Sequence, residues 1–151
     1  MVRSRYAVKL ADWKRLAARL QLARAQVAQF RMEAADGESK PQYLLDSAVV
    51  AVHAMAEYAV NALLELASQK IERHHKTGDR ARDLKADGRL QGDYKKILDQ
   101  LETYRLAAQY LGYGRTPSVH YNATNLEECL SAVDQLVGEV AAALRVSGKL
   151  E

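Results

Sequence analysis

Apolar residues recur at three- and four-residue spacing along four stretches of the chain, which is the period of helices with one face toward a core. These stretches predict helices over residues 8–34, 43–71, 93–111 and 124–147. Long helices that follow one another in this way favour an antiparallel bundle. We therefore predict an all-α fold, a single antiparallel four-helix bundle in which residues 1–151 form one domain.

The ends of these helices carry recognisable signals. A capping box of Ser39 and Gln42 precedes the second helix, and a capping box of Thr124 and Glu127 opens the fourth. Gly148 ends the fourth helix. The second helix is apolar almost all round, so we expect it to be central and covered by its neighbours on most sides.

Residues 72–93 break the periodic pattern. They are polar, contain three glycines and show no sustained period. We predict a long loop between the second and third helices, with one short helix near residues 80–85. A loop of this length is uncommon in a compact domain and is often functional.

The composition excludes other classes of protein. The 8 glycines and 2 prolines are too few for the turns of an all-β fold, and 48% hydrophobic residues argue against disorder. No uncharged apolar run approaches the length of a membrane span, so we expect no transmembrane helix, and the N-terminus lacks the apolar core of a secretory signal. The single cysteine, Cys129, allows no internal disulfide, and we expect a cytoplasmic location.

Positive charge is concentrated at the N-terminal end of the chain. The net charge is +3, but residues 1–31 carry eight Lys and Arg against one Asp, which leaves the remainder acidic. The basic face of the first helix, including Lys14, Arg15 and Arg19, is suited to nucleic acid, an acidic membrane surface or an acidic partner. The alternative is a solvated helix face that neutralises the acidic remainder.

Polar residues interrupt the apolar pattern of the second and third helices. At 100° per residue, Asp46, His53, Glu57 and Asn61 lie within about 80° of one another. Arg105 lies on the apolar stripe of the third helix and needs a carboxylate if it faces inward. We predict an ion pair between Glu57 and Arg105, with His53, Asn61 and Gln109 close by. Two alternatives stay open: the pair only fixes helix register, or the polar stripe is the solvated face of the second helix.

Other chemical motifs are weak. Glu72 and His75 have the spacing of one half of a di-iron site, but the second half and the further glutamates are missing. We therefore predict no metal site and no cofactor. Arg115 and His120 stand five residues apart, and an arginine with a histidine can stabilise charge and move a proton in phosphoryl chemistry.

Three stretches of the chain resemble the HEPN-domain family, whose members are small α-helical bundles of prokaryotic toxin–antitoxin and antiviral defence systems. The first is HAMAEYAVNALLEL, residues 53–66, which is similar to the family's Ala-rich second helix. The second is the polar loop that begins with His74 and His75. The third is YKKILDQLETYRLAAQY, residues 94–110, in which Arg105, Ala108 and Tyr110 match an R-x-x-A-x-Y pattern. Together these stretches cover about residues 40–145.

The resemblance implies a function that depends on one motif. Catalytic members carry an arginine followed after four to six residues by a histidine, and they cleave RNA without a metal at the interface of a dimer. Arg105 matches the family arginine by position, but Gln109 and Tyr110 stand where the histidine is expected. Arg115 and His120 have the right spacing, but they follow the helix and enclose Pro117, which disfavours a helical turn.

Three interpretations follow from this resemblance. The one that we favour is a binding module for RNA, a nucleotide or a protein such as an antitoxin or another defence component. The second is a metal-independent ribonuclease toxin that works as a homodimer through Arg105, Arg115 and His120. The third is a non-enzymatic adaptor, whose signature is an exposed apolar patch on the first or fourth helix.

Overall fold

The computed structural model describes residues 9–35, 43–67, 76–109 and 121–149, and all the regular elements within these ranges are helices. The chain is therefore all-α, as predicted. In chain order the helices are α1 (Leu10–Ala35), α2 (Tyr43–Leu66), α3 (Thr77–Ala86), α4 (Lys95–Gln109) and α5 (Ala123–Val146).

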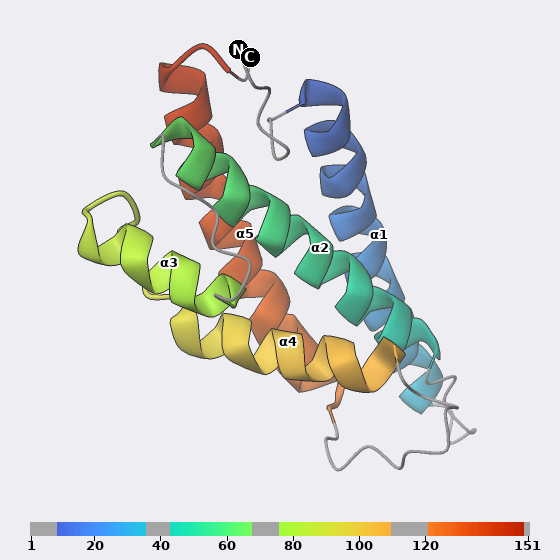
Figure 1. The fold of residues 1–151 in the computed structure, drawn as a ribbon. Coiled ribbons are helices and arrows are strands. Elements are labelled where there is room, and N and C mark those ends of the chain that lie inside the picture. The colour runs from blue at the N-terminus through green and yellow to red at the C-terminus, as the bar shows by residue number, and fades with distance from the viewer. Residues whose placement is uncertain (1–8, 36–42, 68–75, 110–120, 150–151) are drawn as a thin grey trace.

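The helix α2 lies at the centre of the fold and contacts the other four (Figure 1). Around it the order is α1, α5, α4 and α3, with each helix in contact with the next. The chain runs along α2 in the opposite direction to α1 (Figure 1). The central position that its apolar sequence predicts for the second helix is confirmed.

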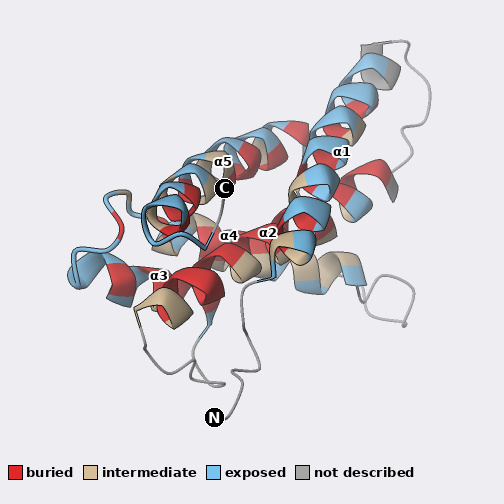
Figure 2. Ribbon diagram, turned by 90° about the horizontal axis from the view of Figure 1, so that it is seen from above, coloured by how far each residue is buried: buried red, intermediate tan, exposed pale blue. Residues whose placement is uncertain are grey.

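Burial of α2 explains its composition. Val49, Met55 and Ala59 are completely inaccessible to solvent, and the buried sides of the surrounding helices face the centre (Figure 2). The segment Leu44–Leu66 is long and apolar enough to cross a membrane, but the other parts of the structure bury 72% of its apolar window. A long core helix meets the same criterion of length and composition.

The apolar spacing predicts the buried faces of the outer helices correctly. In α1 the buried side chains include Trp13, Leu20 and Val27, while the lysines and arginines lie off this stripe. In α5 the buried seam includes Leu126, Val133 and Val140 among others. Each fully buried Leu or Val side chain contributes roughly 1.5–3 kcal/mol to folding.

The prediction of a four-helix bundle with a long loop is wrong over residues 77–86, where the structure has a fifth helix. This helix, α3, is longer than the short helix that we predicted near residues 80–85. Its Ala81 and Leu84 are buried, and Gly78 lies so close to α4 that a Cβ atom would be 2.9 Å from the carbonyl oxygen of Lys95. A helix this short is marginal alone, so these tertiary contacts stabilise it.

The predicted start of the last helix is also corrected. Asn122 caps α5 and forms a reciprocal capping box with Asn125, two residues before the predicted cap at Thr124. Thr124 and Glu127 instead bind the guanidinium of Arg31 from α1. The predicted capping box of Ser39 and Gln42 lies outside the described residues, as does the predicted end of the second helix at residue 71.

Candidate functional site

The polar stripe of α2 lies against α3 and α4, not against solvent. His53 is only 5% exposed and Asn61 only 6% exposed. At the other end of the stripe, Asp46 accepts a hydrogen bond from the Tyr121 hydroxyl. The interpretation of this stripe as a solvated face is therefore wrong for His53 and Asn61, and Glu57 between them is half-buried.

Arg80 of α3 enters this polar region, and the sequence patterns did not single it out. Its Nη1 donates to Asn61 Oδ1, and its Nη2 donates to Thr77 Oγ1 at 3.4 Å. Its Nε is buried without a hydrogen-bond partner. Within the described part of the chain, no carboxylate oxygen lies within 4.0 Å of this guanidinium. Arg80 is thus a half-buried cation that is held by neutral groups.

Arg105 of α4 is bound by residues of its own helix. Its Nη1 donates to Gln109 Oε1 at 2.7 Å, and its Nη2 lies 3.7 Å from Glu102 Oε1, which is too long for a hydrogen bond. Its Nε is buried without a partner. The predicted proximity to Gln109 is confirmed.

The predicted ion pair of Glu57 with Arg105 is wrong, because no such pair forms within 4.0 Å in the described residues. Residues three and four positions away on a helix are neighbours, so Glu102 and Gln109 reach Arg105 without crossing to α2. The positive charge of Arg105 nevertheless acts on the imidazole of His53 in α2.

His53 is the neutral centre of this region. Burial, together with the positive charges of Arg105 and Arg80, lowers the pKa of its imidazole from 6.5 to about 4. Its Nε2 is buried and has no hydrogen-bond partner. At neutral pH this side chain is therefore an uncharged ring beside two guanidinium groups.

We refer to His53, Asn61, Arg80 and Arg105 as the α2–α4 cluster. Buried side-chain atoms without a hydrogen-bond partner are rare in folded proteins, and each one needs an explanation. In the described residues all such atoms belong to α2, α3 or α4. They are His53 Nε2, Glu65 Oε2, Arg80 Nε, Asp99 Oδ1, Glu102 Oε2 and Arg105 Nε. Two incompletely paired guanidinium groups are suited to binding an oxyanion such as phosphate.

The predicted basic face of α1 is exposed. Lys14, Arg15 and Arg19 are all accessible to solvent, and Arg15 lies 3.7 Å from Asp12. The remaining predicted site residues lie outside the described residues, and the structure does not place them relative to the α2–α4 cluster. They are His74, His75, Tyr110, Arg115 and His120.

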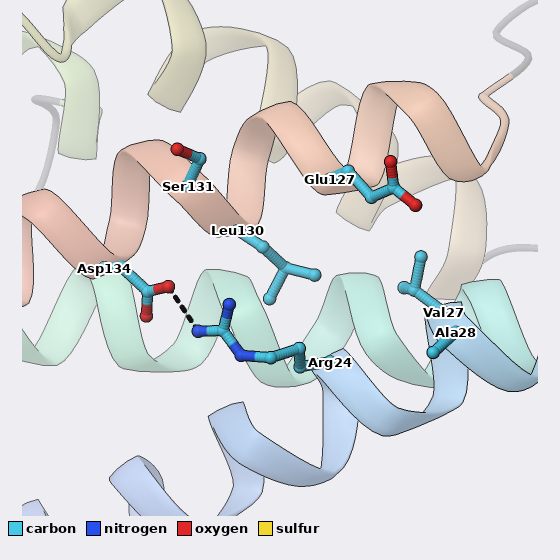
Figure 3. A pocket seen from close by; sticks show the side chains of 7 residues that line it. All are labelled: Arg24, Val27, Ala28, Glu127, Leu130, Ser131 and Asp134. Atoms are coloured by element: carbon cyan, nitrogen blue, oxygen red, sulfur yellow. Dashed lines mark hydrogen bonds and ion pairs between the residues drawn. The ribbon is translucent and has the colours of Figure 1, made fainter.

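A groove of about 260 Å³ separates α1 from α5 (Figure 3). Val27, Ala28 and Leu130 supply its apolar lining, and Arg24 reaches across it to pair with Asp134. The charged side chains that line this groove are all paired, Arg24 with Asp134 and Glu127 with Arg31. These ion pairs connect α1 to α5, and the groove lacks the unpaired donors of the α2–α4 cluster.

No group of three or more His, Cys, Asp or Glu side chains in the described residues is placed to hold a metal ion. A surface depression of about 380 Å³ between α3 and α4 is lined by charged residues, of which Lys95 lies 3.2 Å from Asp79 and 2.6 Å from Asp99.

Comparison with protein families gives a match. The family model described as HEPN domain matches residues 22–143, which is more than half of the chain. This range contains the whole α2–α4 cluster and begins within α1. Comparison with curated proteins and with solved structures gives no match.

Proposed function

Because the chain belongs to the HEPN-domain family, we propose that it acts as a cytoplasmic RNA- or nucleotide-binding helical module of a toxin or defence system. HEPN domains are generally helical modules with ribonuclease or nucleotide-binding roles in such systems, and they commonly dimerise and bind RNA. Phosphate is the chemical group shared by RNA and nucleotides. We assign its recognition to the α2–α4 cluster.

The observation that supports this proposal is that Arg80 is partly buried and has no carboxylate partner among the described residues. A partly buried cation without a carboxylate carries a desolvation cost that a neutral partner compensates only in part. Asn61 and Thr77 orient the guanidinium through its two Nη groups and leave Nε without an acceptor. A phosphate oxygen supplies both the missing negative charge and the missing acceptor.

The second cation of the cluster supports the same chemistry. Arg105 also has an unpartnered Nε, and its nearest carboxylate is 3.7 Å away. Because His53 is neutral, it adds no charge and offers an imidazole nitrogen for a further hydrogen bond. The site therefore resembles a phosphate clamp with two arginines.

The test is a calorimetric titration of the full chain with ATP and with a single-stranded 12-nucleotide RNA at low salt. We expect Arg80→Gln and Arg105→Gln each to weaken binding about tenfold or more, since a hydrogen bond to a charged group contributes about 1.5–3 kcal/mol. Arg82→Gln is the matched control, because Arg82 is on the same helix as Arg80 but is exposed and pairs with Asp79 and Asp83.

Two results contradict the proposal. One is the absence of binding of either probe at low salt. The other is an equal loss in the Arg80 and Arg82 variants, which assigns binding to general surface charge. The salt dependence distinguishes the two ligands, because RNA that contacts several phosphates has a steep slope and a nucleotide has a shallow one.

A second candidate function is metal-independent RNA cleavage by a dimer. The observation that favours it is the five-residue separation of Arg115 and His120 inside the matched range 22–143. We expect His120→Ala to abolish RNA cleavage or cellular toxicity and to leave the helical content unchanged. Wild-type protein that is inert toward RNA and harmless when expressed eliminates this function.

A further inference from the structure

The helix α1 has a second face, opposite to the core, that nothing in the described structure covers. Its residues are spaced by four and three positions in alternation, and they are all exposed. They are Ala11, Arg15, Ala18, Leu22, Ala25, Gln29 and Met32. We call this set the outer α1 face, and Figure 2 shows α1 exposed along the side that points away from α2.

The spacing of the outer α1 face is that of a helix that packs against another helix. Alternating steps of four and three residues place successive side chains on one seam, and small residues on it allow the partner's backbone to approach closely. Leu22 is 59% exposed and Met32 is 73% exposed, and both lie on this seam. The outer α1 face thus exposes two large apolar side chains that a packed partner helix would bury.

The charges of α1 divide into two groups. Arg24 and Arg31 reach toward α5, where they pair with Asp134 and Glu127 and so belong to the fold. Lys14 and Arg19 flank the outer α1 face at the positions that set partner choice in paired helices.

The two flanking cations have no carboxylate within 4.0 Å in the described residues, and Arg15 on the seam itself has only Asp12 at 3.7 Å. Three exposed cations are thus gathered around one end of an apolar seam. The match to the family model begins at residue 22, so this basic end precedes the family region.

We propose that the outer α1 face is a docking surface for one acidic amphipathic helix of a protein partner. The partner's apolar side chains would pack on Leu22 and Met32. Its carboxylates would lie beside Lys14, Arg15 and Arg19. This interaction is separate from phosphate binding at the α2–α4 cluster and does not depend on it.

Two other occupants fit the surface less well. In a parallel pair of two copies, the outer α1 face of each copy presents the same cations, and Lys14 lies near the other copy's Arg19, where like charges repel. Single-stranded RNA is bound by aromatic side chains on which bases stack. The aromatic residues of the described part of α1, Trp13 and Phe30, are buried on the core side.

The probe is a synthetic three-heptad peptide with Leu on its seam and Glu at both flanking positions, and its matched peptide carries Lys in place of Glu. We expect the wild-type chain to bind the Glu peptide and not the Lys peptide, with an affinity that falls as salt is added. The triple variant Lys14→Glu, Arg15→Glu, Arg19→Glu should weaken binding about tenfold or more, since each exposed pair contributes up to about 1 kcal/mol.

Two further variants locate the site. Leu22→Glu changes an exposed residue and should abolish binding without loss of helical content. The control variant Lys76→Glu, Lys96→Glu, Lys149→Glu makes the same change of net charge at exposed positions elsewhere. It should bind the Glu peptide within about twofold of the wild-type chain, because only long-range electrostatics is altered.

Several outcomes overturn the proposal. Equal binding of the two peptides, or an equal loss in the two triple variants, shows that no specific docking surface exists. A wild-type dimer in sedimentation that Leu22→Glu dissociates assigns the face to a second copy. Binding of a 20-nucleotide RNA that is lost in the Lys14, Arg15, Arg19 variant, without binding of the Glu peptide, assigns it to nucleic acid.

Discussion

Protonation of His53 should destabilise the folded protein, because the imidazole is buried beside two cations. Burial first, and then the charges of Arg105 and Arg80, lower the pKa of His53 from 6.5 to about 4. At a pH between these two pKa values, His53 is protonated in the unfolded chain and neutral in the folded chain. The free energy of unfolding therefore falls as the pH is lowered through this range.

The magnitude follows from the pKa difference. Each pKa unit corresponds to about 1.36 kcal/mol, so a fall from 6.5 to about 4 removes roughly 3 kcal/mol of stability once both states are protonated. At pH 5 the loss is already about 2 kcal/mol relative to pH 7. Such a loss is a large part of the stability of a typical domain.

The assay is urea denaturation at pH 7, 6 and 5 for the wild-type chain and for His53→Gln. Carboxylates and the other three histidines titrate in both proteins, so the difference between the two unfolding free energies isolates His53. We expect this difference to change by about 2 kcal/mol from pH 7 to pH 5, in the direction that favours the variant at low pH. The imidazole NMR resonance that is present in the wild-type chain and absent from His53→Gln belongs to His53. Its change with pH gives the pKa of His53 directly.

Replacing a charged neighbour of His53 by a neutral residue provides an independent check of the cause of its lowered pKa. Arg80→Gln should raise the pKa of His53, and Arg82→Gln should leave it unchanged, since Arg80 and Arg105 are the arginines of the described residues whose charges lower this pKa. A His53 resonance that titrates near 6.5 in the wild-type chain refutes the reasoning. So does an unfolding difference between wild type and variant that is independent of pH.

The remaining predictions concern packing and buried groups. Gly78→Ala should lower the free energy of unfolding by roughly 1–3 kcal/mol in urea titration, because its Cβ would press on Asp99 and on the α4 backbone, and normal stability contradicts this. Burial raises the pKa of the Cys129 thiol to about 12, so we expect no reaction with a thiol reagent at pH 8 until the chain is unfolded, and rapid labelling of the native protein contradicts this. Glu139→Ala should cost about 1–3 kcal/mol in thermal or urea unfolding, because this carboxylate accepts hydrogen bonds from two backbone amides and from the Tyr94 hydroxyl, whereas Glu128→Ala should have little effect.

The long helices could be predicted from the sequence because their signal is local. The spacing of Trp13, Leu20 and Val27, or of Leu126 and Val133, depends only on residues three and four positions apart on one helix. The central position of α2 could be predicted for the same reason. A helix that is apolar on nearly every side has to be covered by others.

The helix α3 and the start of α5 could not be predicted in the same way. Thr77–Ala86 has few apolar residues, and its stability comes from Ala81, Leu84 and the close approach of Gly78 to α4. At α5 both Asn122 and Thr124 are suitable caps. The structure uses Asn122, and Arg31 from α1 binds the Thr124 hydroxyl.

The candidate site shows the same division between local and tertiary information. Periodicity alone placed His53 and Asn61 on one stripe of α2 and Arg105 on the apolar stripe of α4, and from it we predicted that an arginine would meet the polar stripe of α2. It named the wrong partner, because Arg80 reaches Asn61 from α3, which was predicted only as a short helix near residues 80–85, while Arg105 pairs with Glu102 and donates to Gln109. The face of a helix on which a residue lies is set by its near neighbours in sequence. The group that it touches depends on the crossing and register of helices far apart in the chain, and these are decided only when the whole core packs.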